Sequence, residues 1–217
     1  MARTYRCADV GERELGLTAA ESACRRGQLV VLPTETVYGL ATDAFSVEGV
    51  ASMRRVQGRS RELPMPVLIG RTSTVDGLVL TLGPSGRALA EAFWPGPLML
   101  VAQSHPSLRW DLGDSQGTVS VRMPIHPLAL ELLRVTGPLA VTAATRSGSS
   151  SPRTIAETED LFGSDVIVYL DAGPLDPGPT STVIDLTGPL PRVVREGAFP
   201  IELLREVAPD LLGPDEA

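Results

Sequence analysis

Lysine and asparagine are both absent from this 217-residue chain, so arginine supplies every one of its 19 basic side chains. A phosphate-binding loop of the Walker type requires a lysine, and so does a Schiff-base mechanism. The missing lysine therefore excludes both of these classes of site.

Histidine and cysteine are scarce, with two residues of each type. His105 and His126 stand far from other candidate ligands in the sequence, so the pattern of a zinc protease is absent. Cys7 and Cys24 lack the spacing of a metal site and are too few for a disulfide framework, which suits a reducing cytosol. We expect no metal bound by the protein itself.

Positive charge is also in short supply, because the net charge is -7 and the isoelectric point is about 4.9. Non-specific affinity for nucleic acids depends on many basic contacts, so any contact with RNA is expected to be local. No segment resembles a signal peptide, and no apolar run is long enough to span a bilayer. The sequence thus predicts a soluble, cytoplasmic protein that does not contact a membrane.

The length and apolar content fit a single domain with its core at about 10–208. Short apolar runs alternate irregularly with amphipathic segments, which predicts an α/β fold: an open, twisted, mixed sheet flanked by helices. The predicted strands are 28–32, 66–69, 98–102, 119–121, 139–141, 166–170, 181–186 and 192–195, and the predicted helices are 12–26, 47–56, 72–80, 84–93, 127–134, 154–162 and 200–207.

The stretch 29–43 organises the rest of the chain. Four apolar residues lead into Pro33, and Thr34, Glu35 and Thr36 follow before Val37-Tyr38-Gly39. This pattern indicates a buried strand that opens into a polar turn, and open α/β sheets bind ligands in loops at strand ends. The local pattern fits an ordinary core strand and turn equally well.

Three further features each have two interpretations. Four arginines between 54 and 61 form either a solvated helix end or a polyphosphate site. Arg122, after a short strand, either binds a carboxylate or pairs with a neighbouring surface acid. The hydroxyl-rich loop 145–152 either cradles phosphate or serves as a connector. Trp94, in a proline-rich turn, is expected to pack in the core.

Seven motifs occur in a fixed order along nearly the whole chain. They are Pro-Thr-Glu-Thr-Val-Tyr-Gly-Leu at 33–40, Gln-Gly-Arg-Ser at 57–60, Phe-Trp-Pro-Gly-Pro-Leu at 93–98, Thr-Val-Ser-Val-Arg-Met-Pro at 118–124, Ser-Gly at 147–148, Ser-Thr-Val-Ile-Asp at 181–185 and Arg-Glu-Gly at 195–197. In this order they resemble the YrdC-like family, the threonylcarbamoyl-AMP synthases.

The resemblance implies a YrdC-like fold with a large concave site, in one domain spanning 1–217. Some relatives carry a second, C-terminal domain, which the resemblance implies is missing here. The implied enzyme is a nucleotidyltransferase that joins L-threonine, bicarbonate and ATP, with Mg²⁺ accompanying the ATP. It releases threonylcarbamoyl-AMP and pyrophosphate for the threonylcarbamoyladenosine modification of tRNA, so tRNA or the tRNA-modification machinery is an expected partner.

The resemblance also assigns roles to individual residues. Thr34 and Ser181 would hold the threonine, and Arg122 would bind its carboxylate. Thr118 and Arg195 match positions that contact the nucleotide.

On the phosphate side the chain departs from the family pattern. The family has a Lys-x-Arg pair and a later Ser-x-Asn pair, whereas this chain has Gln57-x-Arg59 and Ala143-x-Thr145. Arg59, Gln57 and Thr145 are the predicted catalytic group, and Arg59 and Thr145 are also predicted to bind ATP.

Two hypotheses follow from the departure. In the first, the chain is an active synthase whose phosphate clamp is rearranged, with Arg54, Arg55, Arg61 or Arg146 replacing the lost charge. In the second, it is a catalytically impaired paralogue that binds a nucleotide, an amino acid or RNA.

Overall fold

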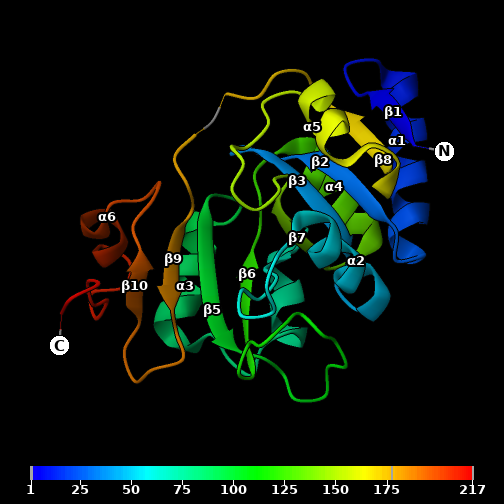
Figure 1. The fold of residues 1–217 in the computed structure, drawn as a ribbon. Helices are drawn as coiled ribbons and strands as arrows, with labels where there is room; N and C mark the ends of the chain where they lie inside the picture. Colours follow the sequence, from blue (N-terminus) through cyan, green and yellow to red (C-terminus); the bar gives the residue numbers. More distant parts are fainter. Residues whose placement is uncertain (1, 177, 217) are drawn as a thin grey trace.

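Ten strands form one mixed sheet in the computed structural model, which describes residues 2–176 and 178–216 (Figure 1). The strand order is β1-β8-β2-β3-β7-β4-β6-β5-β9-β10, and helices flank the sheet, as the sequence predicts. The strands are β1 (Arg3–Arg6), β2 (Leu29–Pro33), β3 (Tyr38–Asp43), β4 (Val67–Leu68), β5 (Leu98–Gln103), β6 (Thr118–Arg122), β7 (Leu139–Ala143), β8 (Val166–Asp171), β9 (Thr182–Asp185) and β10 (Arg192–Arg195). The α-helices are α1 (Val10–Arg25), α2 (Val47–Gln57), α3 (Gly83–Phe93), α4 (Pro127–Thr136), α5 (Ile155–Phe162) and α6 (Ile201–Arg205).

Strand β2 lies inside the sheet and is buried along its whole length. Val30 and Leu32 pack into one apolar cluster, whereas Leu29 and Val31 pack into a second cluster on the other face. This division explains why the strand reads as a continuous apolar run, because successive side chains of a strand point to opposite faces.

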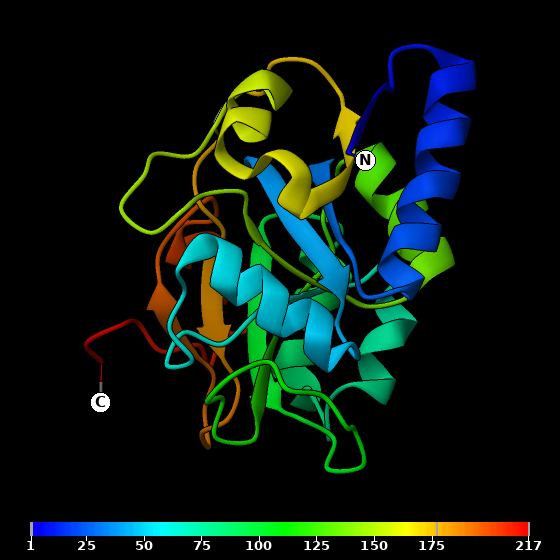
Figure 2. The same ribbon diagram turned by 45° about the vertical axis from the view of Figure 1, so that its right-hand side comes forward.

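Helices cover both faces of the β2–β3 region (Figure 2). Helices α1 and α4 contribute Ala20, Ala23, Leu128 and Leu132 to the cluster that contains Val30 and Leu32. Helices α2 and α5 contribute Val50, Met53, Ile155 and Phe162 to the other cluster. The arrangement leaves loops, rather than helices, at the strand ends where the site lies.

Short polar residues fix where the helices begin. Asp9, Ser46 and Thr154 each accept a hydrogen bond from a main-chain N–H in the first turn of α1, α2 and α5 respectively. Helix α2 ends at Gly58, which has the left-handed φ of 65° that glycine adopts most readily. The sharp stop turns the chain into the arginine-rich segment.

The structure differs from the predicted elements in three places. The predicted helix 72–80 is a 3₁₀-helix, η1 (Thr72–Gly77), after which Leu80 donates its N–H to Gln103 in the neighbouring strand. The sequence pattern predicts no strand at β1 or at β3, although both join the sheet. Strand β3 is buried and pairs with β2 across the polar turn, so tertiary pairing decides its state.

The sequence also predicts that no segment spans a membrane and that the chain forms a single domain. Among the described residues no helix combines the length and the apolar character needed to cross a membrane. The single-domain prediction for 1–217 also covers residues 1, 177 and 217, which lie outside the described residues.

Candidate functional site

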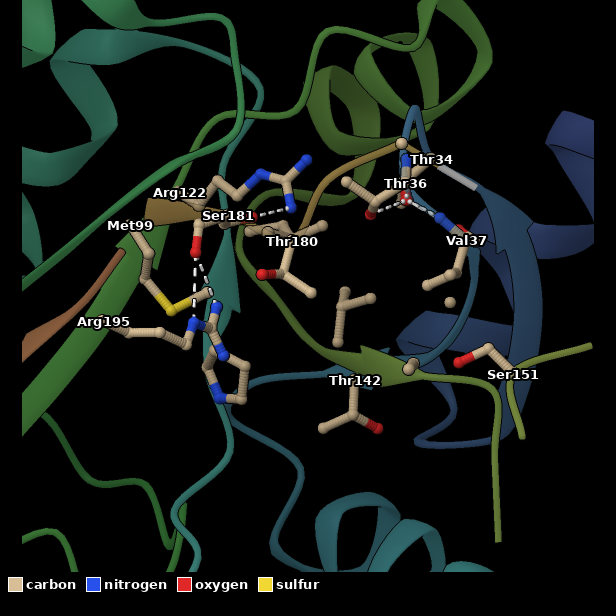
Figure 3. A pocket seen from close by; sticks show the side chains of 16 residues that line it. Thr34, Thr36, Val37, Met99, Arg122, Thr142, Ser151, Thr180, Ser181 and Arg195 are labelled. Carbon is tan, nitrogen blue, oxygen red and sulfur yellow. Dashed lines mark hydrogen bonds between the residues drawn. The ribbon is translucent and has the colours of Figure 1, made fainter. Parts of the chain in front are cut away.

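Two adjoining cavities lie where the ends of β2, β6 and β7 meet the loops around the sheet. The first cavity has a volume of about 260 Å³, and the second has a volume of about 230 Å³. Thr142 and Ala143 of β7 line both of them, so the two cavities adjoin at the end of β7. Figure 3 shows the first cavity, with Arg122, Ser181 and Arg195 on one side and Thr34, Thr36, Val37 and Ser151 on the other.

The polar turn after β2 forms one wall of the first cavity. The Thr34 hydroxyl donates to the carbonyl of Val37 at 2.6 Å and accepts the main-chain N–H groups of Thr36 and Val37. The hydroxyl oxygens of Thr34 and Thr36 also lie 3.0 Å apart, within hydrogen-bond distance. Thr34 therefore shapes the turn, and the Thr36 hydroxyl retains a lone pair for a ligand.

Arg122 forms the opposite wall and is almost fully buried. Its Nη1 donates to the Ser181 Oγ at 2.6 Å, its Nε donates to the Gly96 carbonyl at 3.2 Å, and its Nη2 pairs with Glu35. Burial lowers the pKa of the Arg122 guanidinium, and the nearby Glu35 carboxylate opposes that effect. Of the two interpretations of Arg122, the structure shows an ion pair with an acid, yet the arginine also faces the cavity.

The Pro95-Gly96-Pro97 turn supplies one acceptor for Arg122. A side chain at Gly96 would place its Cβ 2.5 Å from the Phe93 carbonyl, so the turn requires glycine. Trp94 beside it is buried and donates its indole N–H to the Leu98 carbonyl at 2.7 Å, which confirms the expected core role.

Arg195 reaches the first cavity from the edge strand β10. Its Nε and Nη2 donate to the Ser181 carbonyl at 3.1 and 2.9 Å. Gly197 permits this approach, since a Cβ there would lie 2.2 Å from the Thr180 carbonyl. The Arg-Glu-Gly and Ser-Thr-Val-Ile-Asp motifs are thus brought together at Ser181.

The second cavity contains three of the residues predicted for the phosphate side. Its lining is rich in hydroxyl groups and consists of Gln57, Gly58, Arg59, Ser60, Leu63, Thr142, Ala143, Thr145 and Ser147. Arg59 is the one basic residue in this lining, so the cavity carries little positive charge.

Gln57 is buried, and its amide is held within the protein. The Nε2 donates to the carbonyls of Ala143 and Thr145 at 2.7 and 2.8 Å, and the Oε1 accepts from the Thr142 hydroxyl at 2.8 Å. Both amide protons are used by these bonds. Gln57 therefore fastens α2 to the end of β7, and its predicted catalytic role remains a prediction.

Arg59 bonds to its own loop, through Nε to the Leu63 carbonyl at 2.9 Å and through Nη2 to the Pro64 carbonyl at 3.2 Å. Burial lowers its pKa, and the charge of Arg54 lowers it further. Three N–H groups of its guanidinium make no hydrogen bond with another described residue, so the side chain retains donors for a ligand.

The other arginines proposed as replacements for the lost lysine line neither cavity. Arg54 donates to the carbonyls of Ser60 and Leu112, Arg55 donates to Ser52, and Arg61 pairs with Asp111 and Asp114. Arg146 lies over the Phe162 ring, 5.8 Å from its centroid. Arg54 and Arg61 thus hold neighbouring loops together, and a polyphosphate site at this arginine cluster stays a prediction that Arg59 is best placed to serve.

The structure does not bring Thr118 to the other predicted residues. It begins β6, whereas Arg122 ends the same strand, and its hydroxyl donates to Ser115 at 2.7 Å. Thr118 lines neither cavity, so contact with a nucleotide there remains a prediction.

Glu35, Thr36 and Thr142 belong to the site, although the sequence patterns assigned them no role in it. Glu35 and Thr36 stand within the first motif, beside Thr34, and that position was the available signal. Thr142 carried no local signal, since its importance comes from lying between the two cavities.

The donor set does not fit a magnesium ion held by the protein. No Asp, Glu, His or Cys lines either cavity, and the described residues contain no group of three or more such side chains in a metal-binding arrangement. Mg²⁺ prefers carboxylate and phosphate oxygens. A magnesium ion used here would have to arrive on the phosphates of a nucleotide.

Comparisons with known proteins place the chain in a family. The family model Sua5_yciO_yrdC, described as Telomere recombination, matches residues 22–197. A protein of Mycobacterium tuberculosis, provisionally named threonylcarbamoyl-AMP synthase, is 47% identical over 100% of this chain and 98% of its own length.

Solved structures agree with this result. Sua5 of P. abyssi, complexed with L-threonine, superimposes with a TM-score of 0.87 at 30% identity and covers 98% of this chain, which spans 62% of that protein. YciO of E. coli superimposes with a TM-score of 0.79 over 93% of this chain and 98% of its own length, at 22% identity, which shows the shared fold. The chain belongs to the Sua5/YciO/YrdC family.

Proposed function

We propose that this protein synthesises threonylcarbamoyl-AMP from L-threonine, bicarbonate and ATP, and that the product serves the threonylcarbamoyladenosine modification of tRNA. The observation that carries the proposal is that Arg122, Ser181 and the Thr34–Thr36 turn converge on one cavity in a chain whose relatives are named threonylcarbamoyl-AMP synthases. A cytoplasmic location is part of the proposal, because the product must reach tRNA.

The first cavity has the groups needed for a zwitterionic amino acid. Arg122 uses three of its five N–H groups internally, which leaves two to bind a carboxylate. The Ser181 hydroxyl accepts from Arg122, so its own proton is available to the same carboxylate. The Thr36 hydroxyl oxygen, 3.0 Å from that of Thr34, accepts from the α-ammonium.

The second cavity takes the phosphates, and the proposed chemistry occurs where the two cavities meet. The α-ammonium first loses a proton to solvent, and the neutral amine nitrogen then bonds to the bicarbonate carbon, with water leaving to give a carbamate. A carbamate oxygen then bonds to the α-phosphorus, and the bond to the β-phosphate oxygen breaks to release pyrophosphate. Arg59 and the hydroxyls of Thr142 and Thr145 are the protein groups suited to stabilise phosphate charge, with Mg²⁺ carried in on ATP.

A second candidate function is an impaired paralogue that binds amino acid, nucleotide or RNA but reacts slowly. The observation that favours it is the weak positive charge of the second cavity, where Gln57 is fully committed to internal bonds and Arg59 stands alone. Losing one preorganised donor to a developing charge costs about 10²- to 10³-fold in rate.

Pyrophosphate release separates the two candidates. The synthase should release pyrophosphate from ATP only when threonine, bicarbonate and Mg²⁺ are all present, and omission of any one should abolish it. Arg59→Ala should weaken ATP binding and leave threonine binding near wild type, with the exposed Arg134→Ala as the matched control. Threonine binding without pyrophosphate release would identify the impaired paralogue.

A further inference from the structure

Glu35 pairs with Arg122 and is not part of the lining of the first cavity. One carboxylate oxygen pairs with the Arg122 Nη2, and the other accepts the main-chain N–H of Ile125 at 3.3 Å. The side chains of Arg122 and Glu35 are 7% and 18% exposed, so water screens the pair weakly. Glu35 is therefore fixed at both oxygens beside the guanidinium.

Glu35 offsets the charge of Arg122 before any ligand enters, so the first cavity keeps the positive charge of Arg195 alone. Glu35 neutralises Arg122, and the remaining cation in the lining is Arg195, whose side chain is bonded to the Ser181 carbonyl. No carboxylate lines the first cavity among the described residues. A carboxylate bound by the two remaining N–H groups of Arg122, on Nη1 and Nη2, thus brings a second negative charge to the guanidinium that Glu35 already pairs with.

We infer that Glu35 is a positioning and specificity-determining residue, which makes the Arg122 site select a zwitterionic amino acid over a bare carboxylate. The inference rests on the proposed function, since it concerns the same threonine site. Both ligands are attracted by Arg122 and Arg195, but a bare carboxylate is repelled by Glu35 and has no cationic group for Glu35 to attract. An amino acid carries an ammonium group next to its carboxylate, and the attraction of that group to Glu35 offsets the repulsion.

Glu35 also aims Arg122. The guanidinium is planar, so bonds to Gly96, Ser181 and Glu35 on three sides fix which N–H groups face the cavity. A substitution that removes the charge of Glu35 but keeps its shape will therefore alter the selectivity for zwitterionic ligands. A shorter side chain will instead alter the orientation of the Arg122 guanidinium. The two effects can be measured separately.

The experiment compares the binding of L-threonine and 3-hydroxybutyrate, which is threonine without its amino group, by calorimetry. Glu35→Gln keeps an oxygen that accepts from Arg122 and removes the charge. The expected result is that affinity for 3-hydroxybutyrate rises about tenfold relative to affinity for threonine, the order expected for one partly screened charge at this range. Glu131→Gln is the matched control, because Glu131 pairs with Arg13 and lines neither cavity, and it should leave the ratio unchanged.

Glu35→Asp tests whether Glu35 orients the Arg122 guanidinium. It also provides a second variant to measure if Glu35→Gln fails to fold. It retains the charge on a shorter side chain, so the ratio of the two affinities should stay near wild type while threonine affinity falls several-fold. An unchanged ratio in Glu35→Gln, or an equal change for both ligands, would overturn the inference and leave the proposed function standing. If wild type fails to bind threonine at all, the proposed function falls, and this inference falls with it.

Discussion

Arg122 is the residue on which the first cavity depends, because it links three segments that are distant in sequence. Its guanidinium contacts the turn after β2, the turn before β5 and the start of β9 through Glu35, Gly96 and Ser181. A residue with these contacts contributes both to ligand binding and to the stability of the fold. The two contributions need separate measurements.

Arg122→Ala should abolish most threonine binding. The substrate carboxylate loses its charged partner, which costs about 2 kcal/mol or more, or about 30-fold in affinity. The variant should also lose stability, by up to about 3 kcal/mol, since Glu35 is left with an unpaired charge in a partly buried position. Calorimetry measures the first effect, and urea denaturation measures the second.

The double variant Arg122→Ala with Glu35→Ala separates these effects. Removing both charges should recover part of the lost stability and none of the lost binding. Threonine binding that is indifferent to Arg122 would contradict its assignment as the carboxylate partner.

Gln57, Ala143 and Thr145 allow a direct test of the departure from the family pattern. We expect the triple variant Gln57→Lys, Ala143→Ser, Thr145→Asn to release pyrophosphate no faster than wild type, and to be less stable. A lysine cannot accept from the Thr142 hydroxyl, and it places a full charge where the neutral Gln57 amide is buried. Each buried polar group left unpaired costs about 1–3 kcal/mol.

Activity and thermal stability of the triple variant should be measured together. Gln103→Lys, on the exposed end of β5, is the control for adding a lysine without breaking internal bonds. A triple variant with turnover about tenfold or more above wild type would instead identify the site as degraded and establish an impaired paralogue.

Among the elements, the packing of the end of β10 against the start of β9 decides whether Arg195 reaches the first cavity. Gly197 makes this packing possible, since the backbones of Thr180, Ser181 and Thr182 lie where its Cβ would be. The Arg-Glu-Gly motif thus couples an arginine to a glycine for a steric reason.

Gly197→Ala should therefore move Arg195 away from Ser181 and weaken ligand binding as well as stability. Overpacking of a tight contact typically costs about 1–3 kcal/mol. The control is Gly188→Ala, where the nearest heavy atom to a new Cβ is 3.6 Å away. Equal melting temperatures for the two variants would show that the edge strand yields without cost.

At the scale of the whole molecule, the two cysteines link folding to pH, because Cys24 is buried in α1 and Cys7 is partly buried in the turn before it. Burial raises the pKa of the Cys24 thiol to about 12 and that of the Cys7 thiol to about 11, and nearby Asp43 and Asp171 add to the shifts. Both lie above the value of 9.0 for an unperturbed thiol. The folded state therefore holds these protons more tightly than the unfolded state.

This difference predicts a loss of stability at alkaline pH. The contribution of the two thiols is fully present below about pH 9 and is lost as pH rises toward 11 and 12. In that window each proton held only by the folded state costs about 1.4 kcal/mol per pH unit. Urea denaturation at pH 8 and pH 10.5 measures the loss, and it should be smaller in Cys24→Ala. A free energy of unfolding that stays flat across this range would contradict the prediction.

Local patterns in the sequence are sufficient to establish the family, the α/β class and most of the elements. Alternating apolar runs and helix-capping residues act over a few positions, so they can be read without knowing the fold. The ordered motifs assign Thr34, Arg122 and Ser181 to one threonine site, and all three line the first cavity. The buried strand that leads into the Thr34 turn is legible for the same reason.

How those residues are used depends on tertiary contacts. The fold pairs Glu35 with Arg122 and directs the Gln57 amide to β7. It also leaves Thr118 at the opposite end of β6 from Arg122. Each of these outcomes requires contacts between segments far apart in sequence. The direction of a side chain and the partner of a charge depend on which backbones the sheet brings together. A short sequence motif does not specify these tertiary neighbours.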